Sequence, residues 1–109
     1  MTMQHRELAA GRWRAMGLME QLANVGSEVE RAINWQGRNQ AYAVTAAERG
    51  LELLWLTIDD PRNRGRLREL TRLYEVLVDY FFGENQYRSS DELWRRYFGA
   101  YTWAVRAKT

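Results

Sequence analysis

Arginines crowd the segment DDPRNRGRLRELTR, which runs from Asp59 to Arg72. A proline that suits the first turn of a helix precedes all five of them, Arg62, Arg64, Arg66, Arg68 and Arg72, and the first four are the candidate anion-binding residues. Helix N-termini and guanidinium groups both attract phosphate, so this pattern could bind an anion or a nucleic acid. Acidic residues interleave with the arginines and weaken that attraction. We therefore expect a mainly solvated, locally paired face, and keep nucleic-acid binding by the Arg62–Arg72 cluster as an alternative.

Local carboxylates are the expected partners of the arginines that lie toward the buried side. Glu69 follows Arg66 by three residues, and Asp59 precedes Arg62 by three. Residues three or four apart are neighbours on a helix, and exposed ion pairs there contribute about 0.3–0.5 kcal/mol. Local pairing therefore accounts for much of the cluster.

Few residues in the chain suit catalysis or metal binding. The sequence has no cysteine and one histidine, His5, which excludes thiolate chemistry and a Glu-x-x-His di-metal pattern. There is no Ser-His-Asp set, G-x-S-x-G motif or glycine-rich phosphate loop. Glu48 and Glu52 lie four residues apart, and such a lone pair is typical of a surface. We expect a non-catalytic protein without a cofactor or metal.

Polar and aromatic residues also gather around the turn that follows the third helical segment. The group comprises Asp79, Tyr80, Glu84, Tyr87 and Tyr97. A corner of this kind could hold a small ligand or an enzyme site, although tyrosine hydroxyls at a turn more often bond to loop carbonyls. This corner is the second alternative.

Aromatic and aliphatic residues outside the predicted core faces indicate a protein interface. Interfaces are enriched in Trp, Tyr and Arg, and symmetric self-association is the commonest kind. The residues concerned are Trp35, Tyr42, Leu53, Leu56 and Trp103. The sequence therefore predicts a small helical interaction module that forms a homodimer, with a further protein partner as another option.

The composition fits one soluble domain spanning residues 1–109. Hydrophobic residues make up 46% of the chain, charged residues 28%, and the formal net charge is +2. The near absence of lysine matches the codon usage of a GC-rich genome. The first twenty residues carry charges unsuited to a signal peptide, and no apolar run could span a bilayer. Together with the lack of cysteine, this predicts a cytoplasmic protein with no membrane contact.

Apolar residues recur at intervals of three and four nearly throughout, which predicts helices. We expect a long first helix over residues 4–36, and any bend in it falls at Gly26. Residues 39–59 and 60–83 form the second and third, and the fourth begins at Ser89 and has Arg106 and Lys108 near its C-terminus; Asn39, Asp60 and Ser89 are the expected N-caps. Four such helices with short loops predict an all-α, antiparallel four-helix bundle in up-down-up-down order. The expected core includes Leu51, Leu54, Leu70, Leu77 and Tyr101.

Overall fold

All regular structure in the described part of the chain is helical. The computed structural model describes residues 11–107, and the elements are α2 (Leu18–Trp35), α3 (Gln40–Asp59), the 3-10 helix η1 (Pro61–Arg66), α4 (Leu67–Phe82) and α5 (Asp91–Ala107). This confirms the all-α fold class. None of the helices in residues 11–107 has the length and apolar character needed to cross a membrane.

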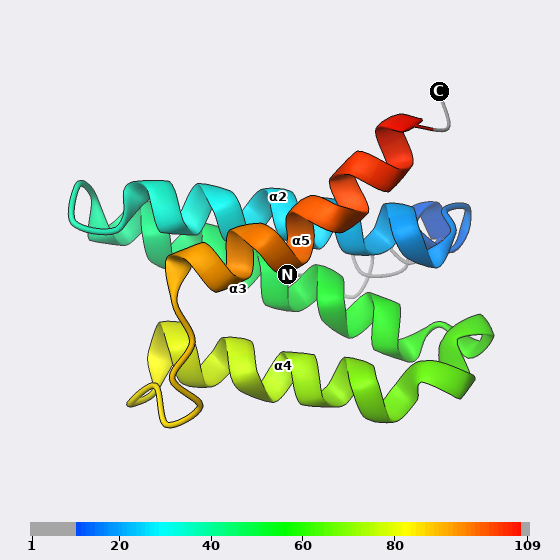
Figure 1. Cartoon of the computed structure of the whole chain (residues 1–109). Helices are drawn as coiled ribbons and strands as arrows, with labels where there is room; N and C mark the ends of the chain where they lie inside the picture. The colour runs from blue at the N-terminus through cyan, green and yellow to red at the C-terminus, as the bar shows by residue number, and fades with distance from the viewer. Residues whose placement is uncertain (1–10, 108–109) are drawn as a thin grey trace.

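The helices pack as a bundle in which α2 contacts both α3 and α5 (Figure 1). A tight turn at Gly37, whose φ of +76° suits glycine, folds α3 back along α2. η1 then leads into α4, which packs on α3. α5 packs mainly on α2, and its C-terminal part projects from the body of the bundle.

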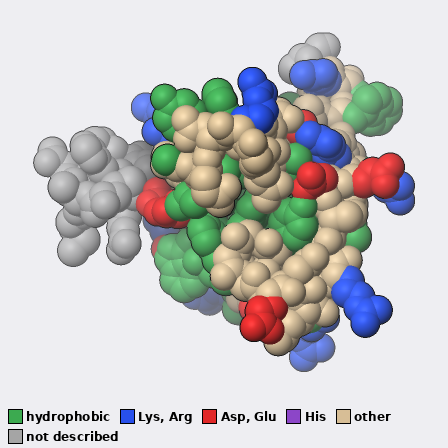
Figure 2. Space-filling view, turned by 90° about the vertical axis from the view of Figure 1, so that its left-hand side faces the viewer, with side chains coloured by type: hydrophobic (Ala, Val, Ile, Leu, Met, Phe, Trp, Pro, Cys, Tyr) green, Lys and Arg blue, Asp and Glu red, His purple; other side chains and the backbone are tan. Residues whose placement is uncertain are grey.

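The core lies between the helices. Viewed from the end that is on the left in Figure 1, hydrophobic side chains fill the centre and charged side chains lie around the edge (Figure 2). Of the expected core residues, Leu54, Leu70 and Leu77 are buried, whereas Leu51 and Tyr101 are half-buried. The main buried cluster has members from the segment before α2 and from each of the four α-helices α2 to α5. It consists of Trp13, Leu22, Val25, Val29, Ile33, Leu54, Leu70, Leu73, Leu77, Trp94 and Phe98.

The first helical segment differs from the expected single helix. Residues 11–14 are helical, the chain leaves the helix at residues 15–17, and α2 begins at Leu18. The break therefore falls at Gly17, while α2 continues through Gly26. The predicted start at Gln4, and His5 with it, lie outside the described residues.

Two of the three predicted N-cap residues cap a helix in the structure, and at the third helix the neighbouring residue is the cap. The Asn39 side chain accepts a hydrogen bond from the Tyr42 amide at 3.1 Å, and Asp60 caps η1. At α5 the cap is Ser90, whose hydroxyl accepts from the Leu93 amide at 3.1 Å, one residue after the predicted Ser89. Ser89 is buried instead, and its amide donates to the Asn85 side chain.

Candidate functional site

A close approach between α2 and α5 forms the base of the candidate site. A Cβ atom at Gly26 would lie only 2.6 Å from Cβ of Phe98, so no larger residue fits without a shift. The absent side chain lets the Phe98 ring pack directly on the α2 backbone. The two helices run in opposite directions, since Gly26 meets Phe98 whereas Glu30 meets Arg95.

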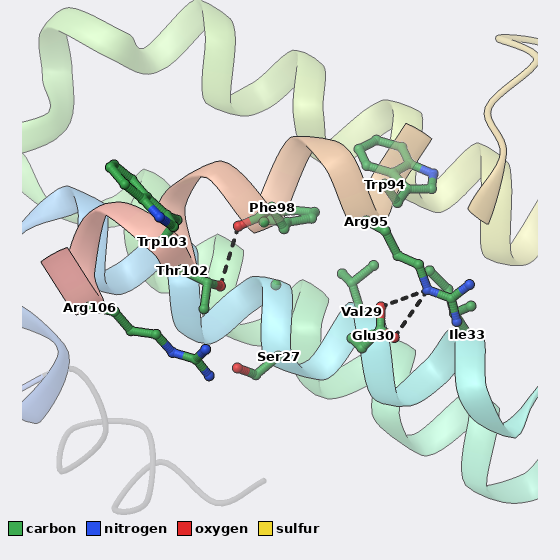
Figure 3. A pocket seen from close by; sticks show the side chains of 12 residues that line it. Ser27, Val29, Glu30, Ile33, Trp94, Arg95, Phe98, Thr102, Trp103 and Arg106 are labelled. Carbon is green, nitrogen blue, oxygen red and sulfur yellow. Dashed lines mark hydrogen bonds and ion pairs between the residues drawn. The ribbon is translucent and has the colours of Figure 1, made fainter. Parts of the chain in front are cut away.

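A groove of about 540 Å³ opens beside this contact, within the range of small-molecule and side-chain pockets. Its buried apolar lining consists of Val29, Ile33, Trp94 and Phe98. Figure 3 shows Arg95 and Arg106 extending from α5 toward α2 at different ends of the groove. The groove can therefore receive an apolar group between charged rims.

Polar groups on the rim are held by their own neighbours. Arg95 Nε donates to the Glu30 carboxylate at 3.0 Å, and Arg95 Nη2 donates to Asn34 at 3.0 Å. The hydroxyls of Ser27 and Thr102 donate to carbonyls one turn earlier in their own helices. Both hydroxyl groups are therefore engaged within their own helices.

Two tryptophans on α5 lie in opposite environments. Trp94 is 2% exposed, and its indole nitrogen has no hydrogen-bond partner among the described residues. Trp103 is 72% exposed and, in Figure 3, points away from α2. Tryptophan is enriched among the residues that carry most of the binding energy of protein interfaces.

A buried polar network lies where the N-terminal segment meets the α3–η1 turn. The Trp13 indole donates to Thr57 Oγ1 at 2.8 Å, and the Gln21 amide donates to both the Trp13 carbonyl and Asp60 at 3.0 Å. Asn63 donates to Gln21 and to the Thr57 carbonyl. Every member finds a partner, so the network fixes structure and offers no ligand site.

Asp60 is 1% exposed and is the charged member of this network. Arg62 donates to it from Nη2 at 2.7 Å and from Nε at 3.1 Å, while another Nη2 bond at 2.7 Å reaches the Met16 carbonyl. The side-chain hydrogen bond from Arg62 is the main cause that holds the pKa of Asp60 well below its usual 3.8. The partner of Arg62 is thus Asp60 and not the expected Asp59, which instead faces Arg14 at 3.7 Å.

The remaining arginines of the predicted anion site do not converge. Arg66 pairs with Glu69 at 3.0 Å, as the spacing predicted. Arg64 and Arg68 are exposed. Arg72 lies over the Tyr87 ring at 4.7 Å. With Arg62 and Arg66 already paired, nucleic-acid binding by this cluster remains an untested prediction.

The predicted interface residues lie in three places. Trp35 and Tyr42 make an edge-to-face contact of 4.9 Å beside the α2–α3 turn. Leu53 and Leu56 are half-buried and pack against the core cluster. Trp103 lies on the C-terminal half of α5, and Figure 1 shows that this part of the helix runs away from the α2–α3 turn. The structure does not bring these five residues into one continuous patch.

The polar corner between α4 and α5 is occupied by its own loop. The Asp79 carboxylate accepts from the Gln86 amide at 2.8 Å and from the Tyr87 amide at 3.0 Å. Tyr80 donates to Asp91, and burial together with this bond raises the pKa of Tyr80 to about 12. Glu84 is exposed, and Tyr97 packs against Tyr101 on α5.

Sequence reasoning missed the buried network of Trp13, Gln21, Thr57 and Asn63. The available signal was position, because Gln21 precedes Val25 by four residues and Val25 precedes Val29 by four. A polar residue on a core stripe calls for a buried partner, which only the folded chain identifies.

Within residues 11–107, no three histidine, aspartate or glutamate side chains gather closely enough to hold a metal ion. No protein family, curated protein or solved structure matches this chain.

Proposed function

We propose that this chain is a small, non-catalytic interaction module that binds a protein partner through the α2–α5 groove and the exposed face of α5 beside it. The observation that carries the proposal is Trp103, 72% exposed at the edge of a groove with an apolar floor. Burying a large aromatic side chain in such a pocket is the commonest source of interface free energy.

The chemistry of the groove supports binding over catalysis. Its hydroxyl groups are bonded within their own helices, and its one carboxylate, Glu30, is paired with Arg95. Charged groups at the edge of an apolar floor match the polar rim and apolar centre of protein interfaces.

Peptides selected from a random displayed library on the wild-type protein provide the test, with affinities measured by fluorescence anisotropy. Ser27→Trp places a bulky ring in the groove and should weaken binding at least tenfold. Thr45→Trp is the matched control, because Thr45 is exposed on α3 and, like Ser27, bonds to a carbonyl four residues earlier. Peptides that bind the wild-type protein and both variants equally would overturn the proposal.

The arginine corner supports the alternative of a nucleic-acid-associated bundle less well. Two of its four predicted residues, Arg62 and Arg66, are engaged by carboxylates. Paired guanidinium groups release fewer counterions from a phosphate backbone, so binding at physiological salt should be absent. A sub-micromolar affinity for RNA or DNA, lost in Arg64→Ala with Arg68→Ala, would favour the alternative.

A further inference from the structure

We infer that the partner is a second copy of this chain, docked antiparallel along α5 with Gly99 at the twofold axis. This rests on the proposed function, because it uses the same face, and it adds the identity and the orientation of the partner.

The exposed face of α5 has the spacing of a helix-pairing seam. Five exposed residues follow one another at steps of four, three, four and three, which keeps them on one side of a helix. They are Glu92, Arg96, Gly99, Trp103 and Arg106. A second helix that lies alongside α5 could therefore contact all five residues.

Gly99 marks the point at which two such helices can approach closely. It is exposed, and a Cβ atom added there would meet no other atom within 4 Å. Glycine in the middle of a helix costs about 0.5–1 kcal/mol relative to alanine. Among residues 11–107, no contact explains this cost, in contrast to Gly26, and a close helix crossing does.

Two of the three charged residues on this face, Glu92 and Arg106, are complementary to each other in the antiparallel orientation, and the third, Arg96, falls opposite Thr102. Glu92 lies seven residues before Gly99 and Arg106 lies seven after it. A twofold axis through Gly99 therefore places Glu92 of each copy opposite Arg106 of the other. Parallel pairing would instead set arginine against arginine.

The same twofold axis places Trp103 of each copy against Arg95 of the other. Trp103 lies four residues after Gly99 and Arg95 lies four before it, so each indole meets Arg95 of the second copy. Arginine stacks well on tryptophan. Arg95 borders the groove, whose volume of about 540 Å³ leaves room for an indole. The face thus carries both a projecting ring and a recess, as an isologous contact requires.

The size of the face predicts a weak dimer. A helix of 17 residues at 1.5 Å per residue is about 25 Å long, and with its shoulders it buries on the order of 500 Å² per copy. Stable interfaces bury about 800 Å² per partner, so we expect a dissociation constant on the order of 10–100 µM.

A charge exchange tests both the partner and the orientation. Glu92→Arg gives a chain with arginine at both ends of the face, and Arg106→Glu gives a chain with glutamate at both ends. In sedimentation equilibrium each variant alone should dimerise at least tenfold more weakly than the wild-type protein. An equimolar mixture of the two should form a heterodimer with near wild-type affinity, because both ion pairs are restored. The double variant should also dimerise.

Further variants distinguish loss of the dimer from loss of the fold. Gly99→Leu should abolish the dimer while keeping the helical circular dichroism, since its side chain enters open space in the monomer. Trp103→Ala should weaken the dimer, and Trp55→Ala should not, because Trp55 is 55% exposed on α3, away from the face. A mixture that stays monomeric, or a Gly99→Leu protein that dimerises like the wild type, would overturn the inference.

The two proposals fail separately. A wild-type protein that remains monomeric at millimolar concentration while binding groove-dependent peptides would reject the second copy and retain the interaction module. A dimer unaffected by every α5 variant would reject the inferred face. A monomer that binds no groove-dependent peptide would reject both.

Discussion

Asp60 shows how much one side chain can connect. Its carboxylate caps η1, pairs with Arg62 and accepts from Gln21 of α2. Arg62 in turn bonds to the Met16 carbonyl. The sequence correctly predicted the cap from Asp60 and Pro61, because capping is local. It could not predict the Gln21 bond, since this depends on a fold that brings together residues 39 positions apart.

Asp60→Asn should lower the free energy of unfolding by about 1.5–3 kcal/mol at pH 7, because a charged hydrogen-bonding group is lost. The folded-state pKa of Asp60 lies below the usual 3.8, so the folded protein holds this carboxylate ionised more strongly than the unfolded chain. Its stabilisation is fully present above pH 3.8 and is lost as pH falls through the lower folded-state pKa.

Urea unfolding at pH 7 and at successively lower pH measures this effect. The difference between wild type and Asp60→Asn should shrink as the solution is acidified below pH 3.8. Asp59→Asn is the matched control, because its side chain is 64% exposed and faces Arg14 at 3.7 Å. A pH-independent difference, or an equal effect of the neighbouring substitution, would contradict the role assigned to Asp60.

At the scale of the element, helix existence was predictable and helix continuity was not. Periodicity correctly located α3 and α5, whereas the segment predicted as one helix over residues 60–83 divides into the 3-10 helix η1 and the α-helix α4. The apolar stripe before residue 36 also keeps its phase across the break at residues 15–17, so periodicity could not reveal it. The sequence indicated Gly26 as the place where the helix could bend. In the structure α2 continues through Gly26, which instead allows close contact with Phe98.

Two buried helical glycines should respond oppositely to alanine. Gly26→Ala should destabilise the protein by about 1–3 kcal/mol, because its Cβ would lie 2.6 Å from the Phe98 Cβ. Gly50→Ala should stabilise it by about 0.5–1 kcal/mol, because the nearest atom to its Cβ would be Glu28 Cβ at an ordinary 3.5 Å. Thermal unfolding followed by circular dichroism compares them. A stabilising shift for Gly26→Ala would show that the α2–α5 contact can relax, and a destabilising shift for Gly50→Ala would contradict the space assigned to its Cβ atom.

At the scale of the whole molecule, the core was largely predictable and the surface patches were not. Leu54, Leu70 and Leu77 were identified from one-dimensional spacing and are buried. The interface residues Leu53 and Leu56 were assigned to a free face, yet both pack against the core. Spacing gives the side of a helix on which a residue lies, but the neighbouring helices decide whether that side is covered.

Leu70→Ala should lower the free energy of unfolding by about 2–5 kcal/mol, because Leu70 is 2% exposed and belongs to the central cluster. Leu93→Ala, at a leucine that is 45% exposed on α5, should change it by less than about 1 kcal/mol. Chemical denaturation of both variants checks the difference. A Leu70 effect as small as that of Leu93 would mean that α4 does not contribute to the cooperative core.

The contrast between the tryptophans has an optical consequence. Trp103 and Trp55 are open to solvent, so they should emit at long wavelength and be quenched by iodide, whereas buried Trp13 and Trp94 should emit at shorter wavelength and resist the quencher. In the Trp55→Ala variant, Trp103 is the most exposed tryptophan that remains among the described residues. Docking on α5 would shield the first signal, and release of residues 11–17 from the bundle would change the second. The chain thus carries its own spectroscopic reporters at two separate positions, and no dye is needed to follow either event.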